Sequence, residues 1–198
     1  MALACCTLAL AAQDGIKVNF KGERPTINDF AGSYLSSFNT DDEEEWIDEP
    51  TNAIKVAWDN YRAGAPQSEG VTLTVDAKNG FVLYESQYEE SLLRIEMCYW
   101  NEADGKHKLF AYNVCSFMNG KGELGQYDRT SFYRYDNATK TMTLTDDIGF
   151  DREYMTDDGA VVTYALPRSG KNIDVTYWYE DGRKQEKTLK FDGRRFSY

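Results

Sequence analysis

Histidine is almost absent from this sequence of 198 residues. The one histidine, His107, lies beside an expected hairpin turn. Zinc sites built from several histidines are therefore excluded, and Ser-His-Asp or Cys-His catalysis would depend on a single turn residue. The phosphate-loop, dinucleotide-binding, nucleophile-elbow and C-x-x-C patterns are missing as well. No residue pattern names a reaction, and we interpret His107 as a solvated turn residue.

Positive charge is also scarce. The chain has 22 basic and 33 acidic side chains, which gives a net charge of −11. Phosphate binding needs clustered Lys and Arg, so nucleic acid and anionic lipid are disfavoured as partners. Residues 27–70 carry ten acidic and two basic side chains, whereas residues 168–198 carry five acidic and eight basic ones. We expect solvated faces that attract each other within one fold. The alternative is that the acidic segment at 41–49 docks a basic partner.

Long apolar runs are missing too: no segment approaches the roughly 20 apolar residues that are needed to span a bilayer. Residues 1–12 are uncharged, with Ala9 and Ala11 at the spacing that signal peptidase requires. We expect a signal-peptide remnant whose basic start is missing. The alternatives are a lipoprotein acylated at Cys5 or Cys6 and a buried first element. The chain is thus predicted to be exported, as a periplasmic, secreted or outer-surface lipoprotein of a Gram-negative bacterium.

Aromatic residues are abundant, at 14% of the chain, within a hydrophobic total of 41%. This is enough apolar surface for a sizeable core. Apolar residues first recur at helical spacing, which predicts short helices over 27–38 and 50–63. Pro50 suits the first turn of the second helix and Gly64 suits its end.

From residue 71 onward the apolar period changes to two. Asn79-Gly80 is the strongest short hairpin signal, and further turn signals follow every 8–12 residues. The predicted fold class is α+β and predominantly β: an antiparallel meander of about nine strands with two short N-terminal helices packed on it. The sheet is expected to be bent or to form a partly open barrel. We expect residues 13–198 to form a single domain.

The second hairpin has a register that can be read from its turn, Asp104-Gly105. This register puts apolar residues opposite each other along one face, as Ile95 with Val114, Met97 with Tyr112 and Tyr99 with Phe110. Cys98 then pairs with Ala111, four residues from Cys115, or about 13 Å along the strand. A disulfide needs Cα atoms within about 7 Å. We therefore predict that Cys98 and Cys115 stay unpaired.

The other face of this hairpin mixes charged and aromatic residues. A carboxylate, a guanidinium and an indole on one concave face can hold a sugar or a small polar ligand. Glu96 is also the best-placed acid for a carboxylate-based hydrolase, although no catalytic residue is predicted. The alternative is a cross-strand ion pair on a solvent-facing side of the sheet. The candidate ligand-binding residues are Arg94, Glu96, Trp100 and Asn113.

Five short sequence segments carry a resemblance to known proteins: VDAKNGF (75–81), CYWN (98–101), FYRYD (132–136), LPRSGKNI (166–173) and LKFDGRRF (189–196). Together they resemble secreted or lipoprotein domains of Bacteroides-like gut bacteria, from residue 71 to the C-terminus. The resemblance implies export and a β-rich fold. It implies no activity and no catalytic residues.

The leading hypothesis is an exported, non-enzymatic binding module for a small molecule, a glycan or a partner protein. Its ligand would lie on the mixed face of the sheet or against the aromatic helices. The alternatives are a carboxylate-based glycoside hydrolase and a structural or interaction subunit that uses the acidic segment at 41–49. The Asp-rich turns are interpreted as turn residues rather than calcium ligands. We expect no cofactor and no metal.

Overall fold

The computed structural model describes residues 15–38 and 48–198. The predictions for the remnant at 1–12 and for most of the segment at 41–49 lie outside these residues. Two helices, α1 (Ile27–Ser36) and α2 (Glu49–Ala63), come near the start. The described residues form twelve strands: β1 (Ile16–Lys17), β2 (Val71–Asp76), β3 (Phe81–Tyr88), β4 (Ser91–Asn101), β5 (His107–Met118), β6 (Lys121–Glu123), β7 (Arg129–Asp136), β8 (Thr141–Leu144), β9 (Val161–Ala165), β10 (Ile173–Trp178), β11 (Lys184–Phe191) and β12 (Phe196–Ser197).

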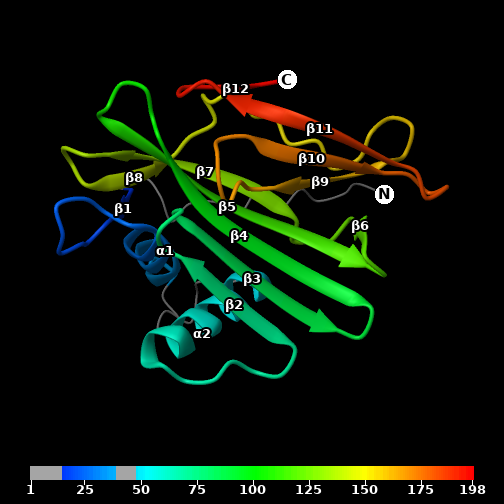
Figure 1. Ribbon diagram of the computed structural model, residues 1–198, viewed down its shortest axis with the longest axis horizontal. Helices are drawn as coiled ribbons and strands as arrows, with labels where there is room; N and C mark the ends of the chain where they lie inside the picture. The colour runs from blue at the N-terminus through cyan, green and yellow to red at the C-terminus, as the bar shows by residue number, and fades with distance from the viewer. Residues whose placement is uncertain (1–14, 39–47) are drawn as a thin grey trace, which may run out of the picture.

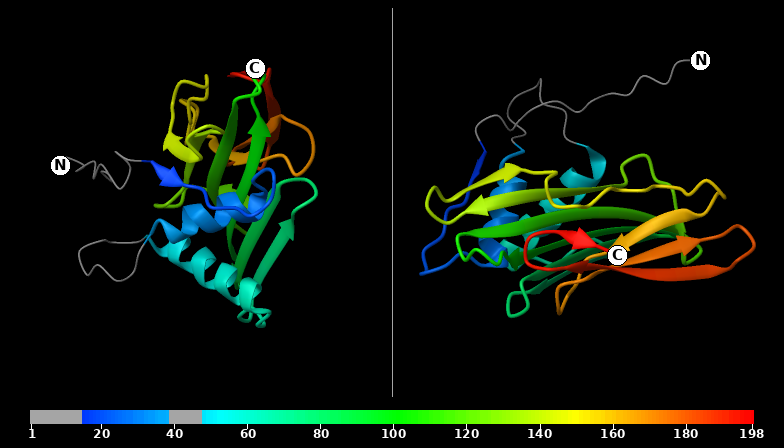
Figure 2. Two further views of the ribbon diagram at one scale, coloured as in Figure 1. Left: turned by 90° about the vertical axis from the view of Figure 1, so that its left-hand side faces the viewer. Right: turned by 90° about the horizontal axis from the view of Figure 1, so that it is seen from above.

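The strands form two antiparallel sheets (Figure 1). The larger has eight strands in the order β1-β8-β7-β5-β4-β3-β2, with β6 paired to β5, and it curls into a half-barrel. The smaller has the order β12-β11-β10-β9. Figure 2 shows the two helices on one side of the large sheet and the small sheet on the other. The predicted fold class, α+β and predominantly β, is confirmed.

The second sheet is the main departure from the predicted meander. Strand β8 cannot be followed by another strand on its outer side, because β1 already pairs there through Ile16 and Met142. The chain instead continues after β8 without further ladder pairing to the large sheet. Strands β9 to β12 then form a sheet of their own against the opposite face from the helices.

The two helices begin and end close to their predicted bounds. At the start of α1 the backbone N–H of Thr26 donates to the carboxylate of Asp29 at 2.7 Å, as in a capping box. The Asp48 side chain caps α2 by accepting from the N–H of Thr51 at 3.0 Å. Gly64 ends α2 in the left-handed conformation, with φ of 66°. The first helix stops two residues earlier than predicted, at Ser36.

Both faces of the central strands β4 and β5 are buried. Toward the helices lies an aromatic core in which the ring of Phe30 stands 5.0 Å from that of Tyr99 and 5.1 Å from that of Tyr135. Toward the small sheet lies a second core around Trp100 and Phe196. A strand between two covered faces has no solvent side, so alternation decides which core a side chain enters rather than whether it is buried.

The register predicted for the second hairpin is confirmed at each pair named above. Cys98 lies opposite Ala111, and both Cys98 and Cys115 are free and buried. The prediction that these two cysteines stay unpaired is therefore confirmed.

Candidate functional site: a groove along the first helix

The four residues predicted to bind a ligand share one face of β4 and β5, as the register requires. That face is not open, because the small sheet covers it. Glu96 is 5% exposed, Trp100 is 4% exposed and Asn113 is fully buried. The expectation of a solvent-facing or concave mixed surface is therefore corrected: this surface is an interior interface between two sheets.

Asn113 bonds to the backbone of β9, the strand at the edge of the small sheet, and Glu96 bonds to the backbone of Leu166, the residue that follows this strand. The amide nitrogen of Asn113 donates to the carbonyl oxygen of Tyr164 at 2.8 Å. The carboxylate of Glu96 accepts the backbone N–H of Leu166 at 2.8 Å. An edge strand leaves every second N–H and C=O without a ladder partner, and burial makes such groups costly. These two side chains complete the hydrogen bonding of β9 where no strand does.

The remaining two candidates have partners within the chain as well. The indole nitrogen of Trp100 donates to the carbonyl oxygen of Lys171 at 3.0 Å. Arg94 forms a cross-strand ion pair with Glu85 at 2.7 Å and lies over the ring of Phe117. Their role in ligand binding stays a prediction, and the geometry gives each of the four a structural partner.

Burial raises the pKa of Glu96 to about 7, and the N–H of Leu166 and the charge of Arg94 only partly oppose this rise. Such a value is typical of a general acid, yet here it follows from enclosure between two sheets. The carboxylate is held by backbone and amide groups of its own chain. Catalysis is therefore not needed to account for the shifted pKa.

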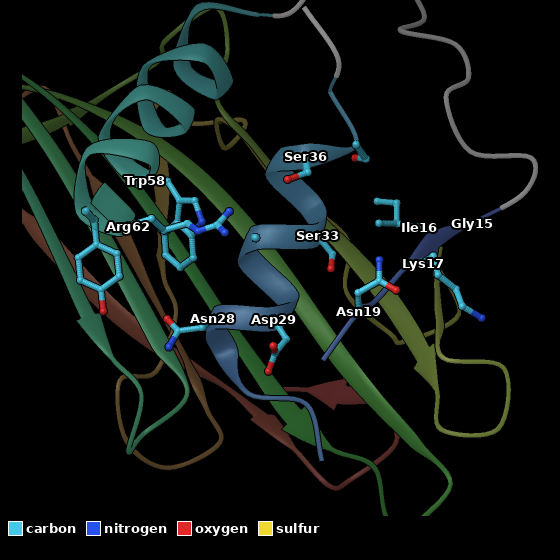
Figure 3. A pocket seen from close by; sticks show the side chains of 13 residues that line it. Gly15, Ile16, Lys17, Asn19, Asn28, Asp29, Ser33, Ser36, Trp58 and Arg62 are labelled. Atoms are coloured by element: carbon cyan, nitrogen blue, oxygen red, sulfur yellow. The ribbon is translucent and has the colours of Figure 1, made fainter. Parts of the chain in front are cut away.

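A groove of about 730 Å³ lies on the outer side of the helical layer (Figure 3). Its floor is the outward face of α1, where every residue is small or polar. Its two walls are α2 and the chain around β1. The lining residues are Asn28, Asp29, Gly32, Ser33, Ser36 and Ser37 of the floor, Trp58, Tyr61 and Arg62 of α2, and Gly15, Ile16, Lys17 and Asn19 beside β1.

The groove exists because α1 has two unlike faces. Its inward residues are large and fully covered, such as Phe30 and Tyr34, and they fix the helix against the sheet. Its outward residues, with Gly32 in the middle, add little height above the helix backbone. A Cβ atom at Gly32 would lie 3.6 Å from the indole nitrogen of Trp58, so the indole edge packs directly against the glycine.

Trp58 has a hydrogen-bond donor without an acceptor. The residue is 3% exposed, and its ring stands 5.6 Å from that of Tyr61. Among the described residues, nothing accepts from its buried indole nitrogen. A buried donor left unpaired costs roughly 1–3 kcal/mol. Figure 3 shows this indole between the two helices, next to the side chain of Arg62.

The groove also offers exposed groups with several chemistries. Tyr61 is 43% exposed and presents an aromatic ring. The side chains of Asn28 and Arg62 are exposed, and Ser33 adds a half-buried hydroxyl. One carboxylate oxygen of Asp29 already accepts two bonds from Thr26, which fixes this acid in place. An aromatic surface beside amide, hydroxyl and guanidinium groups suits a small ligand with many hydroxyls.

Trp58 and Tyr61 lie three residues apart in the predicted helix at 50–63, and one of the two predicted ligand positions is against the aromatic helices, but the groove itself is not predicted. The signal that could have found it is the run of small polar residues on the outward face of 27–38, facing an aromatic helix. What the sequence lacks is the distance between the two helices, which the underlying sheet sets.

No protein-family model, curated protein or solved structure matches this chain. The resemblance to exported domains of Bacteroides-like bacteria therefore stays a prediction. Within residues 15–38 and 48–198, neither helix is long and apolar enough to cross a membrane.

Proposed function

We propose that this protein is an exported, non-enzymatic binding module and that its ligand is a small polyhydroxylated molecule, such as a glycan fragment, held in the groove along α1. The observation that carries the proposal is the indole N–H of Trp58, which is buried without an acceptor at the wall of a groove lined by polar groups. A ligand oxygen would supply the missing acceptor once the indole edge of Trp58 moves slightly away from Gly32 and opens its nitrogen to the groove.

The ligand class follows from the groups around that donor. The exposed ring of Tyr61 provides a flat apolar surface for the C–H face of a sugar ring. Asn28 and Ser33 provide donors and acceptors suited to hydroxyl groups, and the guanidinium of Arg62 adds a permanent positive charge. Lys17 lines the opposite wall. The groove therefore suits a sugar that carries a carboxylate better than a sugar that carries a positive charge.

The alternative is an interaction subunit that uses the acidic segment at 41–49. The residues of this segment that the structure describes favour it less than they favour a binding module. Asp48 forms an ion pair with Arg129 at 2.8 Å and caps α2, so its charge is used inside the fold. Residues 39–47 lie outside the described part of the chain. The binding module is therefore the proposal that the described residues favour.

The test is isothermal titration with a panel of maltotetraose, xylotetraose, N-acetylchitotetraose and tetragalacturonate. We expect at least one to bind, and Tyr61→Ala to weaken that binding about tenfold through loss of the stacking ring. Gly32→Leu should abolish it, because the new side chain fills the groove while leaving the helix intact.

Tyr154→Ala is the matched control, since Tyr154 is also 43% exposed and its ring also lies against a neighbouring side chain, that of Arg152. It should leave affinity unchanged. A panel in which no saccharide binds, or an affinity that survives Gly32→Leu, contradicts the proposal.

Export is tested separately from binding. The uncharged segment at 1–12 ends in small residues suited to signal peptidase. When the protein is expressed from its full gene in a Gram-negative host, we expect the released product to begin at Ala12 or Gln13, as measured by intact mass. Retention of residues 1–11 in a cytoplasmic product of the full gene contradicts export and leaves the groove proposal standing.

A further inference from the structure

A second cluster of polar side chains lies away from the groove, at the turn between β4 and β5. Asp104 accepts from the backbone N–H groups of Lys106 and His107 through one carboxylate oxygen, at 2.8 and 3.0 Å. Its other oxygen lies 2.5 Å from Nδ1 of His107. The turn itself therefore fixes an imidazole against a carboxylate.

Glu102 brings a second carboxylate to the same place. It is 8% exposed, and one of its oxygens accepts from Nε of Arg134 on β7 at 3.0 Å. Its other oxygen lies 4.0 Å from Nδ1 of His107, and none of the described residues donates a hydrogen bond to it. Arg134 holds the carboxylate of Glu102 so that this second oxygen faces the imidazole across the two hollows that Glu102 lines.

The turn does not need this arrangement. One oxygen of Asp104 is sufficient to hold the backbone of the turn, and Gly105 supplies the left-handed residue with φ of 67°. The turn alone does not require Glu102 to stand beside the imidazole, and its ion pair with Arg134 uses only one of its two oxygens. The ligand atoms of Glu102, Asp104 and His107 all lie within 4.8 Å of one another.

We propose that Glu102, Asp104 and His107 form a binding site for a divalent transition cation of the Zn²⁺ type. Three ligand atoms at about 2.1 Å from such a cation stand roughly 3.4 Å apart, so side-chain movements of about 1 Å would close the site. One nitrogen and two carboxylate oxygens form a ligand set that Zn²⁺ accepts, with water completing its coordination.

Access and charge both bear on this site. Glu102 and His107 line two adjacent hollows, of about 540 and 350 Å³, so solvent and a cation can reach the ligand atoms. Arg194 and Arg134 line the smaller hollow. Their positive charges oppose a cation, so we expect micromolar rather than nanomolar affinity.

The single histidine allows a direct test on the full chain. Its imidazole gives one set of NMR signals, and these should move in a saturable 1:1 manner when ZnCl₂ is added. CaCl₂ at the same concentration should leave them in place, because calcium prefers oxygen ligands. Binding of zinc by thiols elsewhere would not move the imidazole signals.

Carboxylate variants test whether zinc is bound by this set of three side chains or by His107 alone. Glu102→Gln should weaken zinc binding about tenfold or more, and Asp104→Asn tests the same ligand set if Glu102→Gln fails to fold. Asp181→Asn is the matched control, because Asp181 caps the N–H of Arg183 in a similar turn without a histidine. Imidazole signals unmoved by millimolar zinc, or a zinc affinity unchanged in the carboxylate variants, overturn the proposal.

Discussion

The two faces of the large sheet are buried in different ways. On the helical side the sheet meets helices whose backbone bonds are satisfied internally, so the interface is mainly apolar and aromatic. Its polar bonds include those from Arg129 to Asp48 and Thr51 at the start of α2. On the other side it meets β9, an edge strand with unpaired backbone groups, and there Glu96 and Asn113 are buried to bond with it. The comparison teaches that a buried polar residue on a strand can indicate the edge of a neighbouring sheet as readily as a ligand site.

The largest effect is expected on the helical face. Phe30→Ala removes a fully buried ring that contacts Tyr99, Phe110 and Tyr135. The free energy of unfolding should fall by about 3–5 kcal/mol, as measured by urea denaturation. The exposed Tyr88 is the control, and Tyr88→Ala should change it by less than about 0.5 kcal/mol. A small loss in Phe30→Ala would mean that α1 contributes little to the core.

The face toward the small sheet should respond to pH through Glu96. Its pKa in the fold is about 7, above the ordinary 4.5. The stability linked to this group is therefore fully present below pH 4.5 and is lost as pH rises through 7. Between pH 5 and 8 the free energy of unfolding should fall by on the order of 3 kcal/mol because of this residue.

Glu96→Gln keeps the shape and removes the titration. Urea denaturation at both pH values should show that the pH dependence in this window largely disappears in the variant, which should be more stable than the parent at pH 8. An unchanged pH dependence would show that the carboxylate is not enclosed between the sheets.

A smaller effect is expected from Asn113, the other residue that bonds to β9. Asn113→Ala leaves the carbonyl of Tyr164 without its side-chain donor and removes the acceptor of Thr130 and Arg152, which should cost about 1–3 kcal/mol. Hydrogen exchange should locate the change, with faster exchange in β9 and β10 than in β2 and β3. Uniform acceleration across both sheets would contradict a local capping role.

The smallest effect concerns the ion pair between Arg94 and Glu85, which lies at the partly exposed end of the same face. Glu85→Gln should lower the free energy of unfolding by no more than about 1 kcal/mol, because the pair is partly solvated and screened. The loss should shrink further at high salt. A loss comparable with that in Asn113→Ala would mean that the two residues belong to one network.

The sequence predicts one face of the sheet far better than the other. Local signals suffice for α1, α2 and the β4–β5 register, because caps, periodicity and the Asp104-Gly105 turn are short-range features. The small sheet is missed because alternation shows which side chains are buried but not what covers them. The edge beside β8 is taken by β1, a pairing between residues more than 120 positions apart that short-range signals do not reveal.

The two candidate sites show the same limit. The groove needs Gly32 and Trp58 to face each other, which only the packing of two helices on the sheet determines. The spacing Glu102, Asp104, His107 is visible in the sequence, yet His107 is interpreted there as a solvated bystander. What changes that interpretation is Arg134 from β7, which orients the buried carboxylate of Glu102.

The most direct test of the proposed function follows the indole N–H signals by NMR during titration with the saccharide panel. Trp100 and Trp178 donate to acceptors within the chain, to Lys171 and Thr163, and serve as internal references. The signal of Trp58 should lie upfield of these two in the free protein and move downfield as a ligand oxygen accepts its proton. A Trp58 signal that stays in place while a saccharide binds, or that moves no more than the two references, would contradict binding in the groove.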